Sequence, residues 1–95
     1  MRPEASLETY FIKKAEENNA LQYKFLSGIT GVPDRLIIYQ GITAFVELKA
    51  KNGVLSKRQK FVINSMRSHG AIVFVPYSKK DIDDIFNNIK RNSIG

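Results

Sequence analysis

Three charged residues in the middle of the chain have the types and spacing that hydrolysis of a phosphate ester requires. Asp34 follows a turn-rich segment, and Glu47 and Lys49 lie two positions apart in a β-rich run. Two carboxylates can hold Mg²⁺ or Mn²⁺, which prefer oxygen ligands and keep several waters. A lysine beside the attacking water can orient it or stabilise the developing negative charge. The three residues therefore predict a metal-dependent site for phosphodiester hydrolysis.

The spacing of two predicted strands brings the two carboxylates together. Residues 36–39 and 42–48 are β-rich and are separated by two residues, which is the length of a tight hairpin turn. If the last residue of the first run pairs with the first residue of the second, the ladder places Asp34 opposite Glu47. Like charges at such positions repel each other unless a cation lies between them, so the register also favours a divalent metal.

Alternation along the second strand decides which side chains share the site. Glu47 and Lys49 are two residues apart and therefore point to the same face of the sheet. Leu48 points into the core, and its backbone carbonyl is a further candidate metal ligand. The alternative is that these charges are ordinary surface residues, which is the commoner role of any single one. That alternative must explain the opposed pair, the lysine and the Pro-Asp turn as coincidence.

Two predicted helices border the candidate site. Residues 3–19 carry apolar side chains at helical spacing, and Glu8 lies on the rim of that stripe, from which its carboxylate can reach a neighbouring site. Alternatively, Glu8 only complements the dipole of the first helical turn. A second helix is expected over residues 56–68, where Ser56 and Gln59 fit a capping box. Capping explains Gln59 and is compatible with a role in the site.

Positive charge gathers at the start of the second predicted helix. Lysine and arginine side chains occupy its first turn, where the helix dipole disfavours cations. A phosphate that approaches this helix start would meet backbone donors and basic side chains together. Alternatively, this is a solvated basic turn whose small cost is screened by salt. The candidate nucleic-acid-binding residues are Arg35, Lys51, Ser56, Lys57, Arg58 and Lys60.

The remaining segments complete a single α/β domain over residues 1–95. Residues 22–26 and 71–76 are predicted strands, and residues 80–90 form a third amphipathic helix. The element order αβββαβα, with a strand–helix–strand crossover, predicts a mixed β-sheet flanked by helices on both faces. A chain of 95 residues is long enough for one core and too short for separate catalytic and targeting domains.

Composition points to a polyanionic partner. Fifteen Lys and Arg against 9 Asp and Glu give a net charge of +6, which favours nucleic acid, although excess lysine can also serve solubility alone. The chain has no cysteine and one histidine, which excludes disulfides and disfavours a zinc site. No signal peptide or membrane helix is expected. Neither a membrane partner nor a small-molecule cofactor is expected.

The charged residues and their neighbours also resemble a known family. Pro33 and Asp34, followed by Glu47, Leu48 and Lys49, resemble the signature of restriction-endonuclease-like, or PD-(D/E)XK, nucleases. A longer pattern between Glu8 and Pro76 is similar to the VRR-NUC branch, of the stand-alone phage or bacterial type. The residues of that pattern are Gly31, Val32, Pro33, Asp34, Glu47, Leu48, Lys49, Gly53, Leu55, Ser56 and Gln59.

The resemblance implies a restriction-endonuclease-like sheet and a site completed by Glu8 and Gln59. It further implies Mg²⁺- or Mn²⁺-dependent cleavage of branched or flapped DNA in repair, recombination or phage replication. A four-way (Holliday) junction is close to two-fold symmetric, so a homodimer that cuts one strand per subunit is expected. A monomeric flap or nicking nuclease and a non-catalytic basic DNA-binding module are the alternatives. The expected compartment is the cytoplasm of a bacterium or of a phage-infected cell.

Overall fold

The computed structural model describes residues 3–50 and 52–93, with side chains from residue 6 onward. Within these ranges, helices and strands follow one another in the predicted order, and each boundary lies within one or two residues of its predicted position. The elements are α1 (Pro3–Glu17), β1 (Leu21–Lys24), β2 (Arg35–Tyr39), β3 (Ile42–Val46), α2 (Lys57–Ser68), β4 (Ile72–Phe74) and α3 (Lys79–Asn92). None of the helices in the described ranges is long and apolar enough to cross a bilayer.

The four strands form one mixed sheet in the order β1-β2-β3-β4. The first three strands are antiparallel neighbours, and β4 runs parallel to β3 because the connection between them passes through α2. Tyr39 pairs with Ile42, which confirms the predicted hairpin register. The turn residues Gln40 and Gly41 have φ of 37° and 89°, the left-handed conformations that a two-residue hairpin turn requires.

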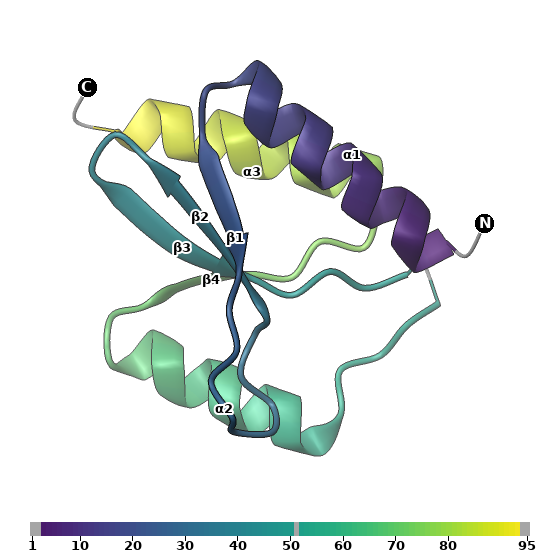
Figure 1. The fold of residues 1–95 in the computed structure, drawn as a ribbon. Coiled ribbons are helices and arrows are strands. Elements are labelled where there is room, and N and C mark those ends of the chain that lie inside the picture. The colour runs from purple at the N-terminus through teal and green to yellow at the C-terminus, as the bar shows by residue number, and fades with distance from the viewer. Residues whose placement is uncertain (1–2, 51, 94–95) are drawn as a thin grey trace.

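Helices cover both faces of the sheet. In Figure 1, α1 and α3 lie together on one side of the strands and α2 lies on the other. The larger core fills the space beneath α1 and α3, where the rings of Phe11 and Phe86 have centroids 6.0 Å apart. Leu48 is buried in this core, as its predicted alternation requires. The buried residues of this core are Leu7, Phe11, Ala15, Ile37, Ala44, Val46, Leu48, Ile82, Phe86 and Ile89.

Polar contacts reinforce the pairing of α1 with α3. The Tyr10 hydroxyl donates a hydrogen bond of 2.8 Å to Asp83, and Lys14 Nζ lies 3.7 Å from the same carboxylate. The hydrogen bond to Asp83 raises the pKa of Tyr10, because the phenol must keep its proton in order to donate. This cluster joins two helices of the scaffold and involves none of the candidate site residues.

Candidate active site

The segment just after β3 keeps its strand geometry and so positions the two charged side chains. The Glu47 amide donates to the Phe74 carbonyl at 2.9 Å, and the Lys49 amide donates to the Pro76 carbonyl at 3.0 Å. The parallel pairing beside β4 therefore extends past the end of β3. Because alternation is preserved, Glu47 and Lys49 point to one face and Leu48 points into the core on the other.

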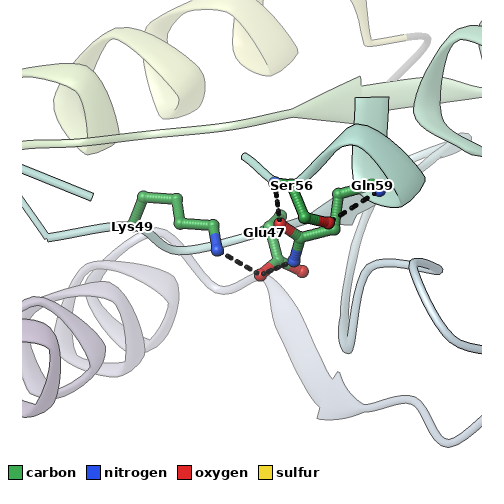
Figure 2. A network of polar contacts seen from close by, with 4 residues as sticks. All are labelled: Glu47, Lys49, Ser56 and Gln59. Carbon is green, nitrogen blue, oxygen red and sulfur yellow. Dashed lines mark hydrogen bonds and ion pairs between the residues drawn. The ribbon is translucent and has the colours of Figure 1, made fainter. Parts of the chain in front are cut away.

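The Glu47 carboxylate is the centre of a small polar network. Lys49 Nζ lies 3.8 Å from Glu47 Oε2, and Gln59 Nε2 donates to the same oxygen at 3.3 Å. Figure 2 shows the lysine approaching this carboxylate from the segment after β3 and the glutamine approaching it from α2. The side chains of Glu47 and Lys49 are only 13% and 18% exposed. Sheltering strengthens the attraction between the two charges, and the two contacts fix the orientation of the carboxylate.

Gln59 connects this network to the start of α2. Its Oε1 accepts a hydrogen bond from the Ser56 amide at 2.9 Å, while the Ser56 hydroxyl accepts one from the Gln59 amide at 3.0 Å (Figure 2). The predicted capping box is therefore confirmed. Because Gln59 caps with its oxygen and reaches Glu47 with its nitrogen, one side chain serves the helix start and the site together.

Asp34 lies at the same end of the sheet as the network but is exposed. The regular β2–β3 ladder ends at the pair Arg35↔Val46, so the predicted pair of Asp34 with Glu47 falls one step beyond it. On the other side, the Asp34 carbonyl accepts a hydrogen bond of 2.7 Å from the Phe25 amide. The backbone at Asp34 is thus fixed against the end of β1, while its carboxylate is accessible to a ligand.

The donor atoms at this end of the sheet suit a hard divalent cation. Asp34 and Glu47 offer carboxylates and Leu48 offers a carbonyl, and Mg²⁺ and Mn²⁺ prefer such oxygen ligands. Continuing the register places Pro33 opposite Leu48, and proline has no amide hydrogen to donate to the Leu48 carbonyl. Among the described residues, no three Asp, Glu, His or Cys side chains gather at one metal position. An ion here would complete its shell with water or phosphate oxygens, as Mg²⁺ usually does.

Arg35 and Glu8 form a separate ion pair on the α1 side of the sheet. Arg35 Nη2 lies 2.9 Å from Glu8 Oε2, and Arg35 Nη1 donates to Gln22 at 3.1 Å. Arg35 is only 3% exposed. The predicted nucleic-acid contact by Arg35 is therefore wrong for this structure, because its guanidinium is buried and already paired. Arg35 pairs with the core residue Val46 and therefore faces the core side of the sheet. It holds the Glu8 carboxylate on that side.

Glu8→Gln is expected to destabilise the fold. The substitution leaves the buried guanidinium of Arg35 with neutral partners only, which costs about 1 to 3 kcal/mol in the free energy of unfolding. The lower part of that range applies, because the Glu8 side chain is 43% exposed. Urea unfolding measures the change, with Glu16→Gln on the exposed face of the same helix as the control. An unfolding midpoint equal to that of the control would contradict the structural role.

The first turn of α2 presents the predicted basic surface. Ser56, Lys57 and Lys60 are exposed, and the first turn carries no acidic residue. Arg58 is also exposed, but its Nε donates to the Thr30 carbonyl at 3.2 Å. This contact fastens the β1–β2 connection to α2, and the sequence spacing gave no sign of it. The prediction for Lys51 lies outside the described residues.

Comparison with known proteins agrees with the motifs. A solved structure of a VRR-NUC domain is similar to this chain, with a TM-score of 0.81 and 29% sequence identity. The alignment covers 92% of this chain and 97% of that one. No family model matches the sequence, and no curated protein matches it. The mixed sheet and its helices define a restriction-endonuclease-like α/β domain. Within that class the similarity supports a VRR-NUC domain, in agreement with the resemblance in the motifs.

Proposed function

We propose that this domain is a Mg²⁺- or Mn²⁺-dependent endonuclease that hydrolyses phosphodiester bonds in DNA. The proposal rests on one observation above all: a sheltered carboxylate, Glu47, is held by Lys49 and Gln59 at a single oxygen. A nuclease family supplies the fold, and the net charge of +6 suits a polyanionic substrate. Asp34, exposed at the same end of the sheet, supplies the second carboxylate.

The residues of the site divide the work of hydrolysis. Asp34, Glu47 and the Leu48 carbonyl would hold the cation. When bound, the metal supplies charge neutralisation at the scissile phosphate and a more acidic water. Lys49, whose ammonium lies beside Glu47, would orient the attacking water or donate to the oxygen on which negative charge develops. Gln59 keeps the Glu47 carboxylate in one orientation, so that the donors are organised before the substrate arrives.

Binding of the DNA backbone is assigned to the start of α2. Lys57, Lys60 and the Ser56 hydroxyl are exposed there, next to the helix end whose dipole attracts anions. These contacts position the substrate without reading its sequence. Affinity is therefore expected to fall steeply as salt rises.

The substrate that we propose is branched DNA, with the four-way junction as the leading case. Each domain carries one candidate site, whereas resolution of a junction requires two symmetric cuts. A homodimer supplies two sites related by two-fold symmetry, which matches the near symmetry of the junction. A monomeric flap or nicking nuclease would use the same residues. The cytoplasm of a bacterial or phage-infected cell is the proposed place of action.

The test is incubation of the purified protein with labelled four-way junction, flap, duplex and single-stranded DNA, each with Mg²⁺, Mn²⁺ or EDTA. Symmetric metal-dependent cuts in the junction are expected. If flap DNA is cut in preference to the junction, the proposed hydrolysis would stand, and the flap would replace the junction as the proposed substrate. Absence of cutting in both metals would contradict the nuclease and favour a non-catalytic DNA-binding module. Sedimentation completes the test, because a fully active species of 10.8 kDa would contradict the homodimer.

A further inference from the structure

The β1–β2 connection, residues 25–34, presents two large apolar side chains to solvent beside the candidate site. Leu26 is 89% exposed and Ile29 is 58% exposed. Isolated exposed apolar residues are common on protein surfaces and need no explanation by themselves. These two differ because they lie on a firmly held loop and border a hollow that also contains Asp34.

Local contacts fix the tip and the base of this loop. At the tip, the Ser27 hydroxyl accepts a hydrogen bond of 3.0 Å from the Ile29 amide, and Gly28 adopts a φ of 77°. At the base, the Phe25 ring packs edge-on against Phe45 with centroids 5.4 Å apart. The exposed side chains therefore extend from a backbone that is already ordered. Little conformational entropy remains to be lost when a ligand binds there.

The side of the loop nearest α2 is packed closely against that helix. The Thr30 carbonyl accepts the hydrogen bond from Arg58, and Gly31 follows with a φ of 97°. A Cβ at Gly31 would lie 3.0 Å from Arg58 Cγ and 3.0 Å from Val62 Cγ2, so the loop backbone touches the helix. Figure 1 shows this connection descending from the sheet to the middle of α2. Arg58 thus contacts the loop at Thr30 and Gly31, directly after the exposed Ile29.

An open hollow of about 370 Å³ lies along the inner side of the loop. Its walls include Phe25, Leu26, Ile29 and Val32, and Asp34 lines it as well. This size falls within the roughly 300 to 1,000 Å³ range of small-molecule sites. The hollow is therefore a mainly apolar recess that borders one of the two carboxylates assigned to the reaction.

We propose that this hollow receives a DNA base that has left the stack of its strand, next to the phosphate on which Asp34 acts. The inference rests on the proposed nuclease function and specifies its substrate class. A base offers flat apolar faces to the walls of the hollow, and the phosphate attached to it carries the charge that Arg58 and Lys57 complement. The homodimer proposed above is assigned to another surface, because beside Arg58 and Lys57 a second copy with its net charge of +6 offers less charge complementarity than a phosphate does.

The inferred pocket explains why branched DNA would be selected. A base inside continuous duplex must be unstacked and unpaired before it can enter, whereas bases at a branch point, flap or end leave the stack at lower cost. The discrimination would then be made by the loop, while Asp34, Glu47 and Lys49 perform the chemistry on any phosphate presented to them. Loop and site can therefore be tested separately.

The experiment uses 2-aminopurine, a fluorescent adenine analogue whose emission rises when it unstacks, placed beside the cut position or branch point. Complexes form in EDTA, so no cleavage intervenes. The wild-type protein is expected to raise the emission, and Leu26→Ser combined with Ile29→Ser to abolish most of the rise. The double substitution is also expected to reduce the preference for branched over paired DNA on the order of tenfold in Mg²⁺. Leu21→Ser, on β1 outside the loop and 54% exposed, is the matched control and should behave as wild type.

Each outcome has a separate meaning. Wild-type complexes without a rise in emission would overturn the inferred pocket whether or not the protein cleaves DNA. An unchanged rise and preference in the double variant would overturn it too and leave the nuclease intact. A shift from dimer to monomer in that variant, with emission unchanged, would identify the loop as a protein interface. If no DNA is cut but the emission rises only with an intact loop, the result would support binding of a base in the hollow and contradict the proposed nuclease activity. The single variants Leu26→Ser and Ile29→Ser provide a second measurement if the double variant does not fold.

Discussion

Lys49→Ala is expected to reduce the rate of DNA cleavage by roughly 10²- to 10³-fold, the usual effect of removing one donor that stabilises developing charge. DNA affinity should stay within about twofold of wild type, since phosphate contacts dominate affinity and we assign these contacts to the exposed basic turn of α2. The Lys49 side chain is only 18% exposed and is directed to Glu47, so it adds little to the accessible charge of the surface. Single-turnover cleavage rates and fluorescence anisotropy of labelled junction DNA measure the two quantities.

The control for this substitution is Lys90→Ala, which removes the same charge from the exposed last turn of α3. It should change neither cleavage nor affinity appreciably. If Lys49→Ala lowered affinity and cleavage in parallel, Lys49 would be a backbone contact instead of a catalytic residue. If cleavage were unchanged, the proposed role of Lys49 in stabilising the developing negative charge would be wrong.

Glu47→Gln is expected to lower metal-dependent cleavage by roughly a thousandfold, because a bound metal supplies several kcal/mol of charge stabilisation. The substitution keeps the size of the side chain and removes its negative charge, so the fold should be retained while the site loses its proposed metal ligand. It also leaves the sheltered ammonium of Lys49 without its counter-ion. Binding of Mn²⁺, followed by electron paramagnetic resonance in the absence of DNA, provides a readout that does not depend on catalysis.

Asp84→Asn is the matched control, since this carboxylate is exposed on α3 and is paired with Lys80. Its removal changes the net charge by the same amount, and Mn²⁺ affinity should be unaffected. Equal Mn²⁺ affinity in wild type and Glu47→Gln would argue that the carboxylate serves only to hold Lys49 and Gln59. The cation would then have to be placed elsewhere.

The register of the central hairpin is the part of the site that could be predicted from sequence. Two β-rich runs separated by two residues allow one tight pairing, and that pairing fixes which side chains share a face. Glu47 and Lys49 lie on one face and Leu48 is in the core, as this reasoning requires. The capping box at Ser56 could be predicted for a similar reason, because its partners are close in sequence and its spacing is specific.

The buried position of Arg35 and its partner were not predicted from the sequence. The register itself pairs Arg35 with Val46, so the core-facing position of Arg35 was implied by the predicted ladder. Charged residues are usually exposed, so the charge of Arg35 taken alone predicts a surface position. The identity of its partner could not be predicted, since Glu8 is distant in sequence and α1 can cross a sheet at many positions. The same holds for Arg58 and Thr30, which are 28 positions apart and meet through a backbone carbonyl without a sequence signature.

The two-residue turn at Gln40 and Gly41 constrains how this domain can diverge. Surface turns usually tolerate insertions, and this one lies at the opposite end of the hairpin from Glu47. Yet one extra residue in this turn could shift the pairing of β3 with β2 by one residue. Such a shift would exchange the two faces of β3. Glu47 and Lys49 would then point into the core, where Leu48 now lies. Relatives that keep the same chemistry should therefore vary the identities of the turn residues while conserving the length of the hairpin, or change that length only by two residues at a time.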